Sequence, residues 1–161
     1  DEEQCRNKLV DRLLVNERMT HWESKGFESR RIGNVDAVIS AVAQFDNFKG
    51  LADAELRQLY LKAGLPEHSS VERAAILEAL RRVLLWESMP AAELQNECQD
   101  NGLLDGDPFK GTEEERHAEY LRRLRMDMCV KTNGDYYRGL DIPVQHLGTL
   151  EVATVAIQLE Q

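Results

Sequence analysis

The sequence predicts an all-α fold, and three observations support that class. A short sequence pattern recurs at one fixed distance. Glu55-Leu56 with Gly64-Leu65 returns 38 residues later as Glu93-Leu94 with Gly102-Leu103. Apolar residues recur at spacings of three and four, which is typical of amphipathic helices. Glycines follow several of these stripes, at the place where a helix end favours them. Together these observations predict a repeated helix–loop–helix unit.

The first helix is predicted from the N-terminus to about Met19. The three acidic residues at 1–3 suit a helix start, because the helix dipole favours negative charge there. An apolar stripe follows at helical spacing and is formed by Leu9, Val10, Leu13 and Leu14. The polar stretch 20–33 is anchored by Trp22 and Phe27, and the sequence leaves its structure open.

A second helix is predicted between Asn34 and Gly50. Asn34 suits the N-cap position, since its side chain can accept hydrogen bonds from the amides of the first turn. One face of this helix is apolar and consists of Val35, Val38, Ile39, Val42 and Phe45. Lys49-Gly50 then ends the element.

The first complete repeat spans 51–85. Its first helix begins at Asp53 or the residue before it, and Gly64 suits the left-handed position after the helix end. Ser69 or Ser70 caps its second helix, and Ser69 with Glu72 completes a capping box. The predicted inward residues are Leu56, Leu59, Tyr60 and Ala63 in the first helix, and Ile76, Leu77, Leu80, Val83 and Leu84 in the second.

The second copy spans 86–131 and has a longer loop. Its first helix begins near Met89-Pro90, Asn101-Gly102 ends it, and Thr112 with Glu115 forms a capping box ahead of the second helix. Matching the arginine pairs of the two copies implies three inserted loop residues, while matching the stripe of the N-terminal helix implies six. The predicted inward residues are Leu94, Cys98, Leu103, Tyr120, Leu121, Leu124 and Met128.

The flanking segments are predicted as partial units. Residues 1–19 would be the second half of a unit, 20–50 a helical insertion, and 132–161 a linker with a partial third unit. Asn133-Gly134 marks a turn. Another first helix begins near Pro143, because the residues around it align with those around Pro90. The chain end admits a buried helix or a β-strand, and the helix is favoured.

These units resemble the SAP motif, a short helix–extended loop–helix module. Leu56, Leu59 and Gly64-Leu65-Pro66 match its first half, and Leu9-Val10-Asp11-Arg12-Leu13 matches its second half, with Arg6 where the family usually has lysine. Met89 to Leu103, followed by Tyr120 to Leu124, is a looser copy. The resemblance covers roughly half of the chain and implies divergent, tandem SAP-like helix–loop–helix units with a helical insertion.

SAP motifs are known as DNA-binding modules, so the resemblance implies nucleic-acid contacts from the loop and the start of the second helix. The arginines that would make such contacts are Arg6, Arg73, Arg81, Arg82, Arg122 and Arg123. Three features oppose this function. The family's Gly-x-Lys before the second helix is absent, and residues 113–115 place three glutamates where a phosphate would bind. The net charge of −9 also repels a phosphate backbone at long range.

The clusters Arg81-Arg82 and Arg122-Arg123-Arg125 also fit a structural role at helix ends, where cations complement the helix dipole. Glu78 with Arg82 and Glu119 with Arg123 are four residues apart, the spacing of an ion pair on one helix face. This structural role is favoured over nucleic-acid binding.

No catalytic, cofactor or metal site is predicted, and the chain is predicted not to be an enzyme. Asp105-Gly106-Asp107 resembles the opening of a calcium loop, but later ligand positions hold Phe109 and Arg116. Glu113 and His117 share a helix face, which favours a surface ion pair over a zinc site. The chain has neither a phosphate-binding loop nor a nucleophile motif.

Large apolar residues outside the repeating stripes are predicted either to seal neighbouring units or to dock a partner protein. The candidate docking residues are Trp22, Trp86, Met89, Phe109, Tyr136 and Tyr137. The favoured function is a non-catalytic structural subunit that packs with other protein subunits into a larger assembly.

Three further features bear on the setting of that assembly. No apolar run in the sequence is long enough to span a bilayer. The three cysteines have no C-x-x-C spacing, which suggests reduced thiols. A chain that starts at Asp1 either has lost a leader or is a fragment, and a cleaved leader would place the host assembly in a plastid or mitochondrion.

Overall fold

The computed structural model describes residues 1–65, 71–104 and 109–139, with 133–139 described by their backbone alone. Within these ranges the chain forms seven helices and no strand, so the predicted all-α class is confirmed there. The helices are α1 (Glu2–Ser24), α2 (Ser29–Ile32), α3 (Val35–Lys49), α4 (Asp53–Lys62), α5 (Arg73–Ser88), α6 (Ala91–Asp100) and α7 (Glu113–Gly139).

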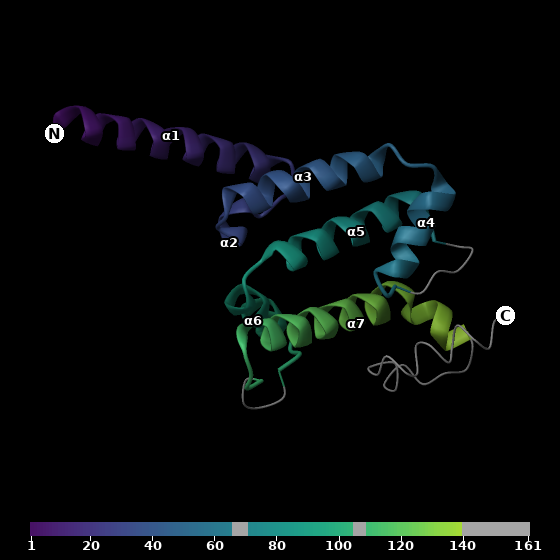
Figure 1. Ribbon diagram of the computed structural model, residues 1–161. Helices are drawn as coiled ribbons and strands as arrows, with labels where there is room; N and C mark the ends of the chain where they lie inside the picture. The colour runs from purple at the N-terminus through teal and green to yellow at the C-terminus, as the bar shows by residue number, and fades with distance from the viewer. Residues whose placement is uncertain (66–70, 105–108, 140–161) are drawn as a thin grey trace.

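Helix α5 lies in the middle of the molecule, with α3 along one side and α7 along the other (Figure 1). Helix α4 packs against α5, and α6 packs against α7, so each consecutive pair forms a helix–loop–helix unit. Helix α1 contacts α2 and then projects beyond the rest of the molecule (Figure 1). One hydrophobic core runs through both units and reaches the residues between α1 and α3.

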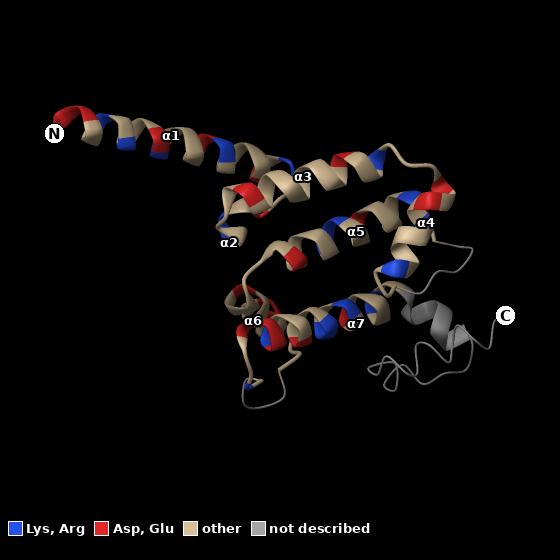
Figure 2. Cartoon of the chain, in the orientation of Figure 1, with Lys and Arg blue, Asp and Glu red and all other residues tan. Residues whose placement is uncertain are grey.

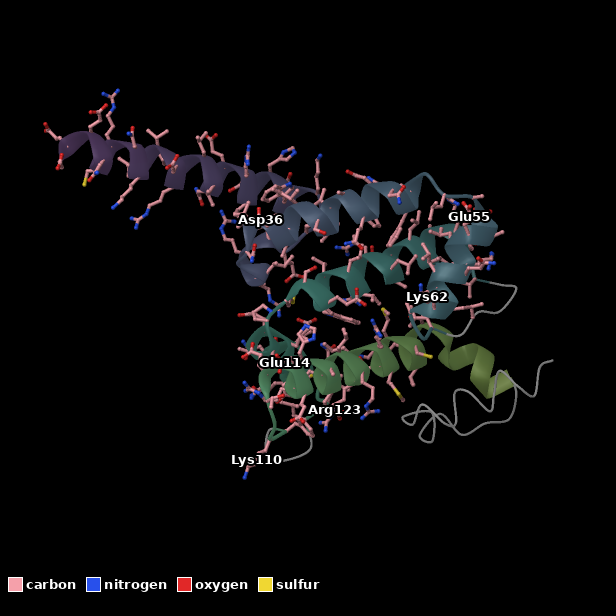
Figure 3. All side chains as sticks on the ribbon, viewed as in Figure 1. Asp36, Glu55, Lys62, Lys110, Glu114 and Arg123 are labelled. Carbon is pink, nitrogen blue, oxygen red and sulfur yellow. The ribbon has the colours of Figure 1, made fainter. Side chains whose placement is uncertain are left out.

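The first helices of the two units match in length and in offset. Helices α4 and α6 each have ten residues, and they begin 38 residues apart, at Asp53 and Ala91. The side chain of Glu55 (Figure 3) accepts a hydrogen bond from the backbone amide of Ala52 at 3.3 Å. In the second unit that amide is missing because the equivalent residue is Pro90.

The two first helices also end in the same way. Gly64 and Gly102 have φ of 83° and 69°, as predicted for a left-handed residue after a helix end. The next amide in each unit closes the turn, from Leu65 to the Tyr60 carbonyl at 3.2 Å and from Leu103 to the Cys98 carbonyl at 2.8 Å. This six-residue closure is a Schellman motif, and it occurs at the same offset of 38 residues.

The predicted equivalence of the inward positions is confirmed. Leu56 and Leu94 are fully buried, and so are Tyr60 and Cys98. Burial does not separate the two alignments of the second helices. Three inserted loop residues pair buried Ala79 and Val83 with buried Tyr120 and Leu124, and six inserted residues pair buried Ile76 and Leu80 with the same two residues.

The predicted helix starts are partly correct. Thr112 and Glu115 form the expected capping box, with bonds of 3.2 Å from the Glu115 amide and 2.9 Å from the Thr112 amide. The capping box at Glu72 is wrong, since α5 begins at Arg73 and Glu72 is itself the N-cap. Ser69 and Ser70 lie outside the described residues. Asn34 caps α3 as predicted, and its side chain accepts from the amides of Asp36 and Ala37.

Several predicted boundaries fall inside helices. Helix α1 continues past residue 19 to Ser24, and α5 continues past 85 to Ser88. Helix α7 runs through Asn133-Gly134, so the predicted turn there is wrong and the boundary at 131 does not separate two elements. The surrounding helix overrides a local turn preference at this position. The predicted partial third unit near Pro143 and the chain end lie outside the described residues.

Candidate interaction surface

Helix α1 is attached to the body by one side of its C-terminal half. The Ser29 hydroxyl donates to the Met19 carbonyl at 2.8 Å, and both residues are buried. The Arg30 guanidinium donates to the side chains of Asn16 at 3.0 Å and Thr20 at 2.9 Å and forms an ion pair with Glu23. These contacts fix the direction in which the helix leaves the body.

The opposite side of α1 carries an exposed apolar stripe, which we call the α1 stripe. It consists of Leu9, Val10, Leu13 and Leu14, whose exposed fractions lie between 46% and 60%. The least exposed residues of α1 are Met19, Trp22 and Glu23. At about 100° per helical residue, the stripe projects roughly 150° away from them. The stripe therefore faces away from the body, and grouped apolar residues of this kind typically mark an interaction site.

The rest of α1 carries both signs of charge along its length, interleaved as Figure 2 shows. The helix holds five acids and four bases, so neither sign dominates. Two of these charges, Arg6 and Glu17, lie close to the centre line of the stripe, four residues before Val10 and four residues after Leu13.

Two of the predicted docking residues lie in the core, which corrects the prediction. Trp86 and Met89 are only 6% and 3% exposed. The Arg82 guanidinium covers the Trp86 ring, with 5.9 Å from its carbon to the ring centroid. The Nε2 atom of His117 lies 3.0 Å from the Met89 carbonyl, which can only accept a hydrogen bond. The connection between α5 and α6 thus seals the two units together.

The other predicted docking residues have different surroundings. Trp22 is half-buried and packs against the core. Phe109 is 38% exposed and lies in the loop before α7. Tyr136 and Tyr137 belong to α7, but their side chains lie outside what the structure describes. Among the side chains that the structure describes, the predicted docking residues therefore do not lie together on one surface.

Four of the six arginines considered for nucleic-acid binding are bound to carboxylates. Glu119 binds Arg122 at 2.9 Å and Arg123 (Figure 3) at 2.7 Å. The other two pairs are Arg81 with Glu78 and Arg73 with Asp53. The predicted pair of Glu78 with Arg82 is replaced by the pair with Arg81, three residues on.

These contacts shift the acid–base properties of the residues involved. Hydrogen bonding from Arg122 and Arg123 lowers the pKa of Glu119 to about 2 despite its burial.

The predicted ion pair of Glu113 with His117 is absent from the described part of the chain, where Glu113 instead lies 3.7 Å from Arg116. Burial raises the pKa of the Cys98 thiol to about 11, so this cysteine is a poor nucleophile.

One arginine that the sequence did not single out joins distant parts of the chain. Arg31 of α2 binds Glu28 at 2.6 Å, and Glu93 and Glu97 of α6 at 3.0 Å and 2.9 Å. Burial lowers the pKa of Arg31, but its hydrogen bonds to the three glutamates outweigh burial and raise it above the ordinary value. Glu93 is equivalent to Glu55, whose side chain accepts from the Ala52 amide. The residue equivalent to Ala52 is Pro90, which has no amide hydrogen, so Glu93 has no such bond to accept.

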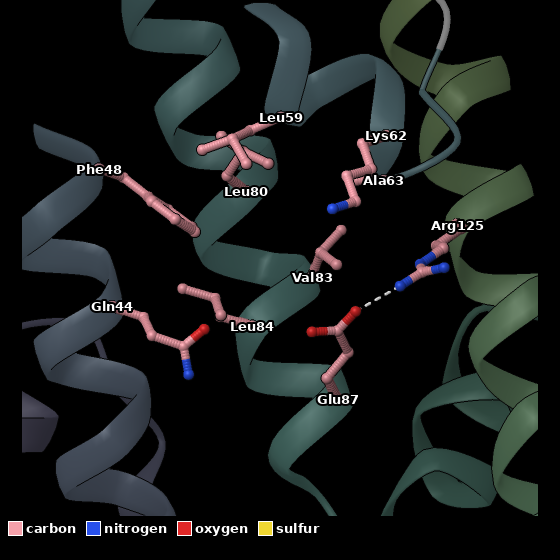
Figure 4. Close-up of a pocket in the computed structure, with 10 residues that line it drawn as sticks. All are labelled: Gln44, Phe48, Leu59, Lys62, Ala63, Leu80, Val83, Leu84, Glu87 and Arg125. Atoms are coloured by element: carbon pink, nitrogen blue, oxygen red, sulfur yellow. Dashed lines mark hydrogen bonds and ion pairs between the residues drawn. The ribbon is translucent and has the colours of Figure 1, made fainter. Parts of the chain in front are cut away.

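A groove lies between α3, α4, α5 and α7 and has a volume of about 360 Å³ (Figure 4). Its floor is apolar and includes Leu80, Val83 and Leu84. Its rim carries Glu87 and Arg125, which bind each other at 2.5 Å. The lining has no histidine, cysteine or serine, and its charged residues are Lys62, Glu87 and Arg125.

No metal site in the described part of the chain and no relative assigns a chemistry to this protein. Among the described residues, no group of three histidine, cysteine or acidic side chains is placed to hold a metal ion. Over the same residues, no helix has both the length and the apolar character needed to cross a membrane. No protein-family model matches the chain, and comparisons with curated proteins and with solved structures find no match.

Proposed function

We propose that this protein is a non-catalytic interaction subunit that docks onto another protein chain through the α1 stripe. The observation that carries this proposal is the projection of four large apolar side chains from a helix that is fixed to the body by its other side. Covering such a stripe removes apolar surface from water, which is the main driving force of protein association. We infer a protein partner because the near-balance of charge on α1 offers little attraction to an anionic membrane surface.

The arrangement of the arginines gives no support to the alternative of a SAP-type nucleic-acid module. A phosphate-binding surface needs cations that are free to replace the counterions of the nucleic acid. Arg73, Arg81, Arg122 and Arg123 are already paired with carboxylates. Electrophoretic mobility with duplex DNA at low salt tests this alternative, and binding that weakens steeply with salt would favour it.

The docking function can be tested with two matched variants of α1. In Leu9→Gln/Leu13→Gln the stripe becomes polar, whereas Val15→Gln makes the same change at an exposed apolar residue on the other side of the helix. Both variants should keep the helical content of the parent protein. Chains that co-purify with the parent protein under mild conditions should be retained by Val15→Gln and lost from the double variant. The proposal fails if the parent protein elutes alone as a monomer, or if the double variant retains every associated chain.

A further inference from the structure

We propose that the partner of the α1 stripe is a second copy of the same chain, with the two α1 helices antiparallel. This inference rests on the proposed docking function and names its partner. It depends on where the charges lie relative to the stripe, and on the direction in which the stripe faces.

Opposite charges on the stripes of two copies meet only when the second helix runs antiparallel to the first. Two antiparallel helices centred between Asp11 and Arg12 place Val10 of one copy level with Leu13 of the other. The same placement brings Arg6 level with Glu17, and the two-fold axis repeats both contacts. Two apolar layers at the centre are then flanked on each side by an ion pair.

Other arrangements of the two helices lose this match. In a parallel pair each residue meets its own copy, so Arg6 faces Arg6 and Glu17 faces Glu17 near the centre line. Like charges in direct contact oppose association. Sliding the antiparallel pair by one heptad places Val10 level with Arg6, or Leu13 level with Glu17, and separates the apolar layers. The charge pattern therefore selects one orientation and one register.

The structure leaves room for this pairing without rearrangement. Every side chain of α1 from Glu2 to Arg18 is exposed, and the helix projects beyond the body (Figure 1). Because each stripe faces away from its own body, the two bodies lie on the outer sides of the helix pair. The contact is small, since the stripe covers about two helical turns, so we expect a weak dimer whose population rises with protein concentration.

The test exchanges the two charges and measures association of the 161-residue chain by sedimentation velocity over a range of concentrations. Arg6→Glu places two glutamates against each other, and Glu17→Arg places two arginines against each other. Each single variant should raise the dissociation constant of the dimer at least about 10-fold. The double variant Arg6→Glu/Glu17→Arg should return to the parent value, because the exchange restores opposite charges. An equimolar mixture of the two single variants should also associate, since each supplies the charges that the other lacks.

Val15→Gln is the control, and it should leave the dissociation constant unchanged. Circular dichroism reports whether each variant keeps its helices. The inference is overturned if the parent chain stays monomeric, if the single variants associate like the parent, or if the double variant fails to recover. Its failure is distinguishable from failure of the proposed function. If the charge variants change nothing while Leu9→Gln/Leu13→Gln still loses a different chain, the function stands and the second copy is not the partner.

Discussion

Two glycines are required by the backbone rather than by packing. Gly64 and Gly102 have positive φ, and a Cβ added at either would meet no atom within 4 Å. A side chain at these positions therefore has space, but it would be held in a conformation that disfavours it. The cost of substitution should come from the backbone alone.

Gly64→Ala and Gly102→Ala should each reduce the free energy of unfolding by about 1 kcal/mol, measured by urea denaturation. Gly50→Ala is the matched control, since Gly50 follows a helix with φ of −88° and its Cβ would make an ordinary contact. That variant should be neutral or slightly stabilising. Equal losses at all three positions would show that the left-handed conformation is not the cause.

Glu119 links stability to pH through a single side chain. Its pKa in the folded protein is about 2, below the value of 4.5 that an unperturbed glutamate has. A depressed pKa stabilises the fold fully above the unfolded value, and this stabilisation is lost as pH falls toward the folded value. The unfolding free energies of the parent protein and Glu119→Gln should therefore differ most near neutral pH. The difference should shrink between pH 4.5 and 2, as urea denaturation at pH 7 and pH 3 can measure. A difference that stays constant over that range would contradict the ion pairing.

Between elements, Arg31 connects the N-terminal helices to the second unit. Its guanidinium touches one carboxylate from its own neighbourhood and two from α6, and it is partly buried. Several charge-assisted hydrogen bonds converge on one planar group, a geometry that lysine cannot reproduce.

Arg31→Ala should reduce the free energy of unfolding by roughly 1–3 kcal/mol, because three glutamates lose a shared partner. Arg31→Lys should recover only part of this loss. Lys131→Ala breaks an ion pair with Asp127 and a long hydrogen bond of 3.4 Å to Asn101, and should cost less than about 0.5 kcal/mol. Thermal or urea unfolding of the three variants measures these differences. A loss at Arg31 no larger than the loss at Lys131 would mean that the cluster does not hold α2 to α6.

Across the whole molecule, the two units share one core, so a change in the core of one unit alters the stability of both. Leu56 and Leu94 occupy equivalent, fully buried positions in a single cluster of side chains. A cavity at either position should therefore weaken the entire body rather than one unit.

Leu56→Ala and Leu94→Ala should each cost roughly 2–5 kcal/mol and leave a single unfolding transition. Leu61→Ala, on the exposed side of α4, is the control and should cost much less. Urea unfolding followed by circular dichroism measures both the loss and the number of transitions. Two separate transitions in Leu94→Ala would show that the units unfold independently.

The candidate site was harder to predict from sequence than the fold, and particular residues show why. Trp86 and Met89 looked like docking residues because they lie outside the repeating apolar stripes, but the last turn of α5 and the connection after it are folded into the core. Leu9 and Leu13 have the spacing of a stripe that a core would cover, and they are exposed. The signal that could have found them is local, since charged Arg6 and Glu17 lie on the line that a core-facing stripe would continue.

The sequence by itself determined both ends of α3, α4 and α6 and the start of α7. Asn34, Thr112, Gly64 and Gly102 act through hydrogen bonds and backbone angles within a few residues, so their roles follow from local order. Only the tertiary structure decided which apolar stripes are covered. The stripes of α1 and α5 have the same spacing, yet α5 lies between α3 and α7 whereas α1 extends into solvent. Burial depends on contacts between residues far apart in the chain, as in the bonds from Arg31 to Glu93 and Glu97, and spacing along one helix cannot specify those contacts.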